Sequence, residues 1–238
     1  MTNTTWDKYQ TFFCAPEGLG VSLDVSRMNF APSFIDEMAD KTEKAFAAMD
    51  ELEKGAIANP DEHRQVGHYW LRNPSIAPKE RRDEVENTLE LVKEFAAKIH
   101  SGEVKTQGGE KFENVLVVGI GGSALGPQFA SHALGSADDK MSVYFVDNTD
   151  PDGIDMTLAR LGEALGKTLT IVISKSGGTK ETRNGMLETR AAYEKARLDF
   201  PKHAAAVTGR GSQLDCIANG EKWLERFPMF DYVGGRTS

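Results

Sequence analysis

Two glycine-rich loops, each directly following an apolar segment, limit the fold of this chain more than any other feature of its sequence. The first runs VLVVGIGGSALGP over residues 115–127, and the second runs TIVISKSGGTKET over residues 170–182. Both apolar segments are rich in Val, Ile or Leu without polar alternation, which predicts buried strands of a parallel sheet. A helix is expected to begin after each loop. Because the free N–H groups and positive dipole end of a helix N-terminus favour an anion, both loops are candidate anion sites.

The second loop carries side chains that strengthen this prediction. Several hydroxyl groups and one ammonium group fall within and just after its glycines. Hydroxyl donors in that number suit the several oxygens of a phosphate monoester. The loop therefore predicts a phosphate site to which the following residues contribute: Ser174, Lys175, Ser176, Thr179 and Thr182.

From residue 114 onward, predicted strands and helices alternate. The fold class that this order predicts is α/β, a doubly wound parallel sheet in a flavodoxin-like three-layer sandwich, with both glycine loops at the carboxyl ends of strands. The predicted strands are 115–120, 141–147, 168–174 and 203–208, and the predicted helices lie near 124–134, 154–162, 179–197 and 212–219.

Residues 1–113 have a different pattern, and we predict an α-helical N-terminal region there. Apolar residues recur at helical spacing between Phe34 and Leu52 and again between Val85 and Ile99. We expect this region to leave apolar surface exposed. The boundary is predicted at 113/114, followed by the sheet domain over 114–238, in which residues 230–233 are strand-like.

Composition argues against several classes of function. A net charge of −8 over 238 residues argues against a nucleic-acid-binding surface, which is normally basic. Two cysteines without CxxC spacing, and five histidines without metal-ligand spacing, argue against a disulfide framework and a metal site. No secretory leader is recognised, and no apolar run approaches the roughly 20 residues of a membrane helix. We expect a cytoplasmic protein that binds neither nucleic acid nor membrane.

Two other motifs compete with the phosphate prediction. Residues 119–124 also satisfy the GxGxxG/A dinucleotide fingerprint, with Asp147 as a candidate ribose-binding acid, so a nucleotide-binding oxidoreductase stays open. The run GEALGKT over residues 162–168 is similar to a P-loop but is one residue short and precedes a strand, so we reject it.

Three motifs in order, GIGGSALGP, SKSGGTKET and VGGRTS, resemble the glucose-6-phosphate isomerase (phosphoglucose isomerase) family, which is built from sugar-isomerase (SIS) domains. They cover roughly residues 114–238, and VGHYWLRNP over residues 66–74 is similar to a segment of the family's N-terminal helical region. The chain departs from common family patterns at SKSGGT, where many members have SKTFTT, and at GGRTS, where an aromatic residue commonly follows the arginine. Neither change removes a donor that the mechanism needs.

The resemblance implies a role for each matching residue. The hydroxyls of the second loop would hold the phosphate of a hexose 6-phosphate, with Lys175 nearby. The family interconverts glucose 6-phosphate and fructose 6-phosphate by ring opening and proton transfer through a cis-enediolate, without a metal or organic cofactor. In that scheme Gly122 and Ser123 line the sugar, Gly235 and Arg236 approach C1 and C2, Arg236 stabilises the oxyanion, and Glu181 supports the ring-opening histidine.

The family's base, ring-opening histidine, C-terminal lysine and second SIS domain have no counterpart in these residues. We therefore interpret the chain as an N-terminal portion with the first SIS domain cut near its end, and expect it to be inactive alone. The full-length enzyme is expected to be a homodimer. The alternative is a stand-alone SIS module that binds a sugar phosphate without catalysis.

Overall fold

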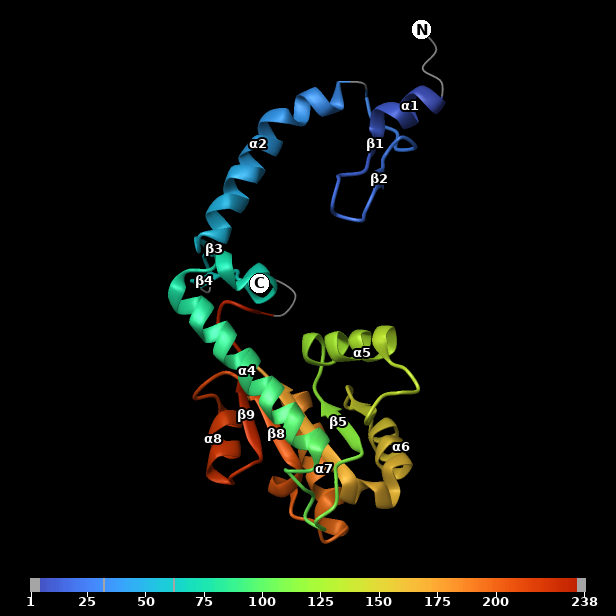
Figure 1. Ribbon diagram of the computed structural model, residues 1–238, viewed down its shortest axis with the longest axis vertical. Helices are drawn as coiled ribbons and strands as arrows, with labels where there is room; N and C mark the ends of the chain where they lie inside the picture. Colours follow the sequence, from blue (N-terminus) through green and yellow to red (C-terminus); the bar gives the residue numbers. More distant parts are fainter. Residues whose placement is uncertain (1–4, 32, 62, 235–238) are drawn as a thin grey trace. The chain divides into compact units, whose positions relative to one another are not determined.

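The structure is a computed structural model that describes residues 5–31, 33–61 and 63–234 (Figure 1). The chain divides into two compact units, residues 1–50 and 51–238. A domain boundary at 113/114 stays a prediction. None of the helices in the described ranges is both long and apolar enough to cross a membrane.

The first unit contains short elements followed by one long helix. Its short strands pair in an antiparallel ribbon, and rings of Trp6, Tyr9 and Phe13 stack with centroids 5.0–5.5 Å apart. The elements are α1 (Thr5–Phe12), β1 (Phe13–Cys14), β2 (Leu23–Asp24) and α2 (Phe34–Glu53), which runs past the end of the unit.

The predicted exposure of apolar surface in the N-terminal region is confirmed. No residue of α2 is buried, and its Phe34, Ile35, Phe46 and Met49 are all exposed. The apolar residues of an amphipathic helix normally pack against a neighbouring element. Within the described part of this unit nothing buries those of α2, so they form an exposed apolar surface.

A five-stranded parallel sheet forms the centre of the second unit, in the order β6-β5-β7-β8-β9. Counted along the chain this is the order 2-1-3-4-5 of flavodoxin-like folds, which confirms the predicted fold class. The strands are β5 (Asn114–Val118), β6 (Ser142–Val146), β7 (Thr168–Ser174), β8 (Ala204–Thr208) and β9 (Glu225–Pro228).

The end of the sheet differs from the sequence prediction. Strand β9 lies at 225–228, whereas the strand-like pattern was assigned to residues 230–233, which instead form a turn after it. The reason is a set of tertiary contacts. The carbonyl of Thr208 accepts a hydrogen bond from Met229, just beyond the β8–β9 ladder, while Phe230 and Tyr232 pack away from the sheet.

Helices cover both faces of the sheet. One apolar cluster joins α6, α7 and α8 to Leu116, Val118 and Val172, and a second joins α4 to Leu169 and Ala205 on the opposite face. Figure 1 shows α4 running diagonally across β8 and β9. The helices are α4 (Lys79–Ser101), α5 (Gly122–Leu134), α6 (Pro151–Leu161), α7 (Lys180–Lys195) and α8 (Gln213–Gly220).

A third cluster connects the segment before α4 to the last described residues. Trp70, Ala77 and Val85 bury Tyr232 between them, and the Trp70 and Tyr232 rings lie 5.4 Å apart. This part of the unit contains β3 (Ile57–Asn59), β4 (Arg64–Gln65) and α3 (His68–Arg72); short 3-10 turns lie at Pro74–Ile76, Gly162–Lys167 and Phe200–His203. The Gly162–Lys167 turn leads directly into β7, so this run precedes a strand, unlike a P-loop, which follows one.

His203 makes the stability of this fold sensitive to pH. Its ring is fully buried, Nδ1 donates to the carbonyl of Thr168 at 3.1 Å, and burial lowers its pKa below the ordinary value. The unfolded chain therefore binds a proton more readily than the folded one as pH falls below about 6.5, and folding stability decreases.

When the pH is lowered from 7.5 to 5.5, we expect the Tm of the wild-type protein to fall by about 2–4 °C more than that of His203→Gln. At this chain length the difference corresponds to roughly 1 kcal/mol in the free energy of unfolding. Gln retains a donor for the Thr168 carbonyl but cannot be protonated. Thermal unfolding followed by circular dichroism at both pH values measures the difference, and equal losses in the two proteins would contradict it.

Candidate functional site

The two glycine loops lie side by side because the strands before them are neighbours. β5 pairs with β7 in parallel from Asn114 opposite Thr168 to Val118 opposite Val172, so their carboxyl ends share one edge of the sheet. From this edge the chain leaves β5 toward β6 on one side and β7 toward β8 on the other. Such a switch point is where open α/β sheets bind ligands.

The first loop turns sharply and opens α5. Gly121 has φ of +56°, a conformation that side chains rarely adopt. At Gly119 a Cβ atom would lie 3.0 Å from the carbonyl oxygen of Ser123, so the turn is tight. Gly122 and Ser123 are thereby placed in the first turn of α5, with Gly122 exposed and Ser123 half-buried. The N–H of Ser123 donates to the carbonyl of Ile120 at 3.1 Å, which closes this turn.

Ser174 organises the second loop from the end of β7. Its buried hydroxyl accepts a hydrogen bond from the N–H of Gly177 at 3.2 Å and donates to the Thr179 hydroxyl at 3.3 Å. The Ser176 hydroxyl accepts from the N–H of Gly178 at 3.2 Å. Because Ser176 and Thr179 act as acceptors in these contacts, their own hydrogens can point to an anion.

Helix α7 completes this cradle. Thr179 is its N-cap residue, and the helix starts at Lys180, so the N–H groups of its first turn open onto the loop. Thr182 is buried and Glu181 is exposed, both within the first turn. The structure thus brings Ser174, Ser176, Thr179 and Thr182 to one loop and helix start.

Strand β8 supports the loop from the other side, through residues that the sequence analysis did not single out. The Thr208 hydroxyl donates to the carbonyl of Ser174 at 2.6 Å, and the N–H of Gly209 donates to the carbonyl of Lys175 at 2.9 Å. A Cβ atom on Gly209 would lie 2.8 Å from that same carbonyl oxygen. The run TGRGS after the predicted strand 203–208 was the signal in the sequence.

The Lys175 ammonium does not face into this cradle. It donates to the carbonyls of Asp231 and Val233, each at 2.9 Å, in the segment that follows β9. Gly235 and Arg236 lie outside the described residues. The predicted site residues Gly122, Ser123 and Glu181 are held on the first turns of α5 and α7.

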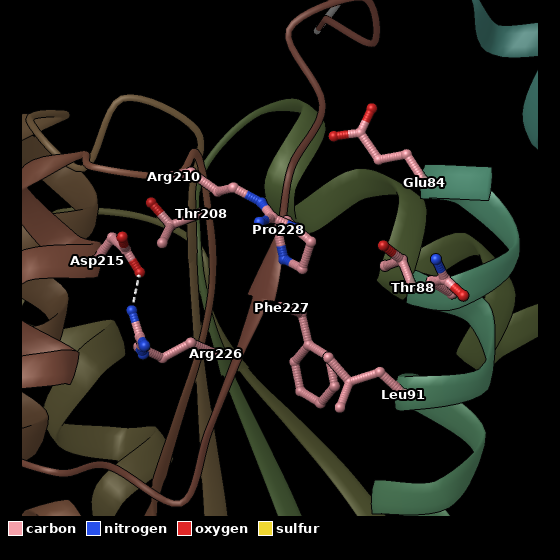
Figure 2. Close-up of a pocket in the computed structure, with 10 residues that line it drawn as sticks. Glu84, Thr88, Leu91, Thr208, Arg210, Asp215, Arg226, Phe227 and Pro228 are labelled. Atoms are coloured by element: carbon pink, nitrogen blue, oxygen red, sulfur yellow. Dashed lines mark hydrogen bonds and ion pairs between the residues drawn. The ribbon is translucent and has the colours of Figure 1, made fainter. Parts of the chain in front are cut away.

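A polar hollow of about 430 Å³ lies at the same edge of the sheet, between α4 and the ends of β8 and β9 (Figure 2). Arg210 reaches toward Pro228, and Glu84 stands on the opposite wall. Asp215 pairs with Arg226 at 2.6 Å; a hydrogen bond from the N–H of Gly211, together with Arg226, lowers the pKa of the Asp215 carboxyl. The hollow was not predicted, since it joins segments far apart in sequence.

No three His, Cys, Asp or Glu side chains in the part of the chain that the structure describes gather as a metal ion requires.

Gly177 is the glycine on which the geometry of the second loop depends most. Its φ is +67°, and a Cβ atom there would overlap the backbone nitrogen of Leu214. By contrast, a Cβ atom on Gly178 would meet nothing nearer than the Gln213 side chain at 3.5 Å. We expect Gly177→Ala to lower the free energy of unfolding by about 2 kcal/mol or more, and Gly178→Ala by less than about 1 kcal/mol. Urea unfolding of the two variants tests this, and equal effects would refute it.

Comparison with known proteins assigns these loops to a family. The family described as phosphoglucose isomerase matches residues 25–238. The glucose-6-phosphate isomerase of Desulfitobacterium hafniense strain Y51 is 53% identical over 100% of this chain, and that of Geotalea daltonii is 56% identical over 98%. The chain spans 45% and 44% of the length of these two relatives.

Solved structures agree. A crystal structure of a glucose-6-phosphate isomerase from Chlamydia trachomatis superposes with a TM-score of 0.81 and 25% identity, covering 99% of this chain and 45% of that one. A hypothetical protein from Thermus thermophilus shares the fold, with a TM-score of 0.60 and 24% identity over 86% of this chain and 43% of that chain. The sequence match over most of the chain and the shared fold lead to one conclusion: the chain belongs to the phosphoglucose isomerase family.

Proposed function

We propose that this chain supplies the sugar-phosphate-binding part of an enzyme that interconverts glucose 6-phosphate and fructose 6-phosphate. The observation that carries the proposal is the cradle after β7. There, hydroxyls with available hydrogens meet the N-terminus of α7 at the switch point of the sheet. Fixed hydrogen-bond donors and a helix N-terminus together favour a phosphate dianion.

In this proposal Ser174, Ser176, Thr179 and Thr182 form the phosphate site. Ser176 and Thr179 donate to the phosphate, while Ser174, whose hydrogen goes to Thr179, orients the loop. Gly122 and Ser123, in the first turn of α5, line the sugar. Supporting this division, the two loops follow neighbouring strands, so one extended ligand can reach both. Binding the phosphate at a fixed point orients the far end of the sugar, which reduces the entropy lost in reaching the reacting geometry.

The proposed chemistry is ring opening followed by proton transfer between C2 and C1 through a cis-enediolate. Gly235 and Arg236 would lie close to C1 and C2 of the sugar. Arg236 would stabilise the oxyanion that develops there, because a fixed cation lowers the energy of a charge that exists chiefly in the transition state. Glu181 would support the histidine that opens the ring. The cradle binds and orients but does not carry the proton, since neutral hydroxyls are weak bases at pH 7.

Several wider features belong to the same proposal. They are a place in glycolysis and gluconeogenesis, a cytoplasmic location, a homodimer of the full-length enzyme, and an N-terminal region over 1–113 that precedes a first SIS domain over 114–238. Family membership supports each of them.

Removing the Thr179 hydroxyl should weaken sugar-phosphate binding. We expect Thr179→Ala to raise the Kd for glucose 6-phosphate about fivefold or more, equivalent to roughly 1 kcal/mol for a lost hydrogen bond to a charged group. Thr179→Ser keeps the hydroxyl and should bind within about twofold of wild type. Isothermal titration calorimetry on the 238-residue chain measures both, and unchanged affinity in Thr179→Ala would refute this placement.

Arg236 should matter for turnover rather than for binding the phosphate. In an isomerase of full family length that carries this sequence, we expect Arg236→Ala to lower kcat by about 10²-fold or more. Arg160→Ala, on the exposed side of α6, is the matched control and should leave kcat unchanged. A coupled assay of fructose 6-phosphate conversion gives the rates. Sugar-phosphate binding without any turnover in that protein would favour a binding module instead of an enzyme.

A further inference from the structure

Four consecutive backbone carbonyls after β9 are held by donors from two distant parts of the chain. The segment 231–234 forms no strand, yet each of its carbonyl oxygens accepts a hydrogen bond. Lys175 Nζ donates to Asp231 and Val233 at 2.9 Å each, the N–H of Gly67 donates to Tyr232 at 2.8 Å, and His68 Nε2 lies 3.3 Å from the carbonyl of Gly234.

We propose that Lys175 is a positioning residue that ties the second glycine loop to segment 231–234, and so sets the point from which Gly235 and Arg236 continue. The inference rests on the proposed function for its consequence in catalysis, but the tie itself is independent of it. The Lys175 ammonium bonds backbone carbonyls of the chain, whereas the phosphate is held by the hydroxyls of the second loop.

The backbone of Lys175 is fixed, which makes the tie rigid at its origin. Its carbonyl accepts from the N–H of Gly209, and the preceding residue, Ser174, is held by the hydroxyl of Thr208. From this base the ammonium reaches two carbonyl oxygens of one segment at equal distance. An ammonium is a compact group with three donors, so it can bond two carbonyls of one turn, those of Asp231 and Val233, without a planar geometry.

The other side of the segment is held by the body of the unit. The Tyr232 ring is packed by Trp70 at 5.4 Å and covered by the Arg81 guanidinium at 4.9 Å, and its hydroxyl donates to Glu84 at 3.2 Å. A Cβ atom on Gly67 would lie 2.6 Å from the Tyr232 ring, so this contact is close. Tyr232 therefore anchors the segment to α4, and Lys175 connects it to the phosphate loop.

This geometry couples two parts of the proposed site. In this proposal a phosphate that orders the hydroxyl loop also orders Lys175, the residue that holds segment 231–234. The coupling is carried by named hydrogen bonds, so removing the ammonium should uncouple the two parts without removing a phosphate donor.

Hydrogen–deuterium exchange on the 238-residue chain tests the tie directly. We expect Lys175→Met to raise the exchange rate of the peptide covering residues 229–234 at least about tenfold. Lys175→Arg should restore most of the protection. The matched control is Lys195→Met, at the far end of α7, which should exchange as wild type. Unchanged protection in Lys175→Met would overturn the proposal.

Inorganic phosphate separates this inference from the proposed function. We expect saturating phosphate to slow exchange over residues 229–234 in wild type but not in Lys175→Met, and a slowing of equal size in both proteins would overturn the coupling. If phosphate protects neither the second loop nor segment 229–234 in wild type, the phosphate site fails. The phosphate-free comparison above still decides the tie.

Kinetics in an isomerase of full family length that carries this sequence distinguish a positioning role of Lys175 from direct phosphate binding by its ammonium. A positioning role predicts that Lys175→Met lowers kcat about tenfold while KM for fructose 6-phosphate changes less than about threefold, with partial recovery in Lys175→Arg. A rise in KM of about tenfold or more with unchanged kcat would instead mean that the ammonium binds the phosphate, and would overturn the proposal.

Discussion

The parallel pairing of β5 with β7 is the constraint on which the rest of the structure depends. It aligns the carboxyl ends of two strands whose following segments are both rich in glycine. Because the chain leaves these strands in opposite directions, nothing of the sheet lies between the two loops at that edge. Each loop turns sharply at a glycine with positive φ, Gly121 in one and Gly177 in the other. Topology alone therefore places both loops at one edge of the sheet, before any side chain is considered.

Buried polar groups hold β7 in its place at the centre of the sheet. The carbonyl of Thr168 accepts hydrogen bonds from the hydroxyl of Tyr193 at 2.9 Å and from the ring of His203 at 3.1 Å. Burial raises the pKa of the Tyr193 phenol, which keeps it a neutral donor. These two contacts favour one arrangement of α7 and β8 against β7, because a shift would leave the Tyr193 hydroxyl or the His203 Nδ1 without its partner. The second glycine loop follows the other end of this strand.

The electrostatics of the site are local. With a net charge of −8, the chain does not attract an anion through its overall field. In the proposed phosphate site, attraction is left to hydroxyl hydrogens, to the N–H groups of α7 and to the dipole of that helix. The ammonium of Lys175 lies against carbonyl oxygens, so even the nearest cation of the loop acts through structure. Arg210 and Arg226 stand at the same edge, and Arg226 is paired there with Asp215 at 2.6 Å.

Local pattern in the sequence determined the class of the fold and the strands and helices that carry the loops, and it predicts the chemistry of the loops. Runs of Val and Ile predict β5 and β7, glycines predict the turns, and hydroxyls in SKSGGT predict the phosphate cradle, because each depends on neighbours within a few residues. Only the tertiary structure decided where β9 lies, which residues of TGRGS support the loop, and where the Lys175 ammonium points. The Met229–Thr208 contact beside β9 joins residues 21 positions apart, and the contacts of Thr208 and Lys175 join residues 34 to 58 positions apart. A local pattern carries no information about such partners; they become neighbours only when the strands are ordered in one sheet and Tyr232 is packed against α4.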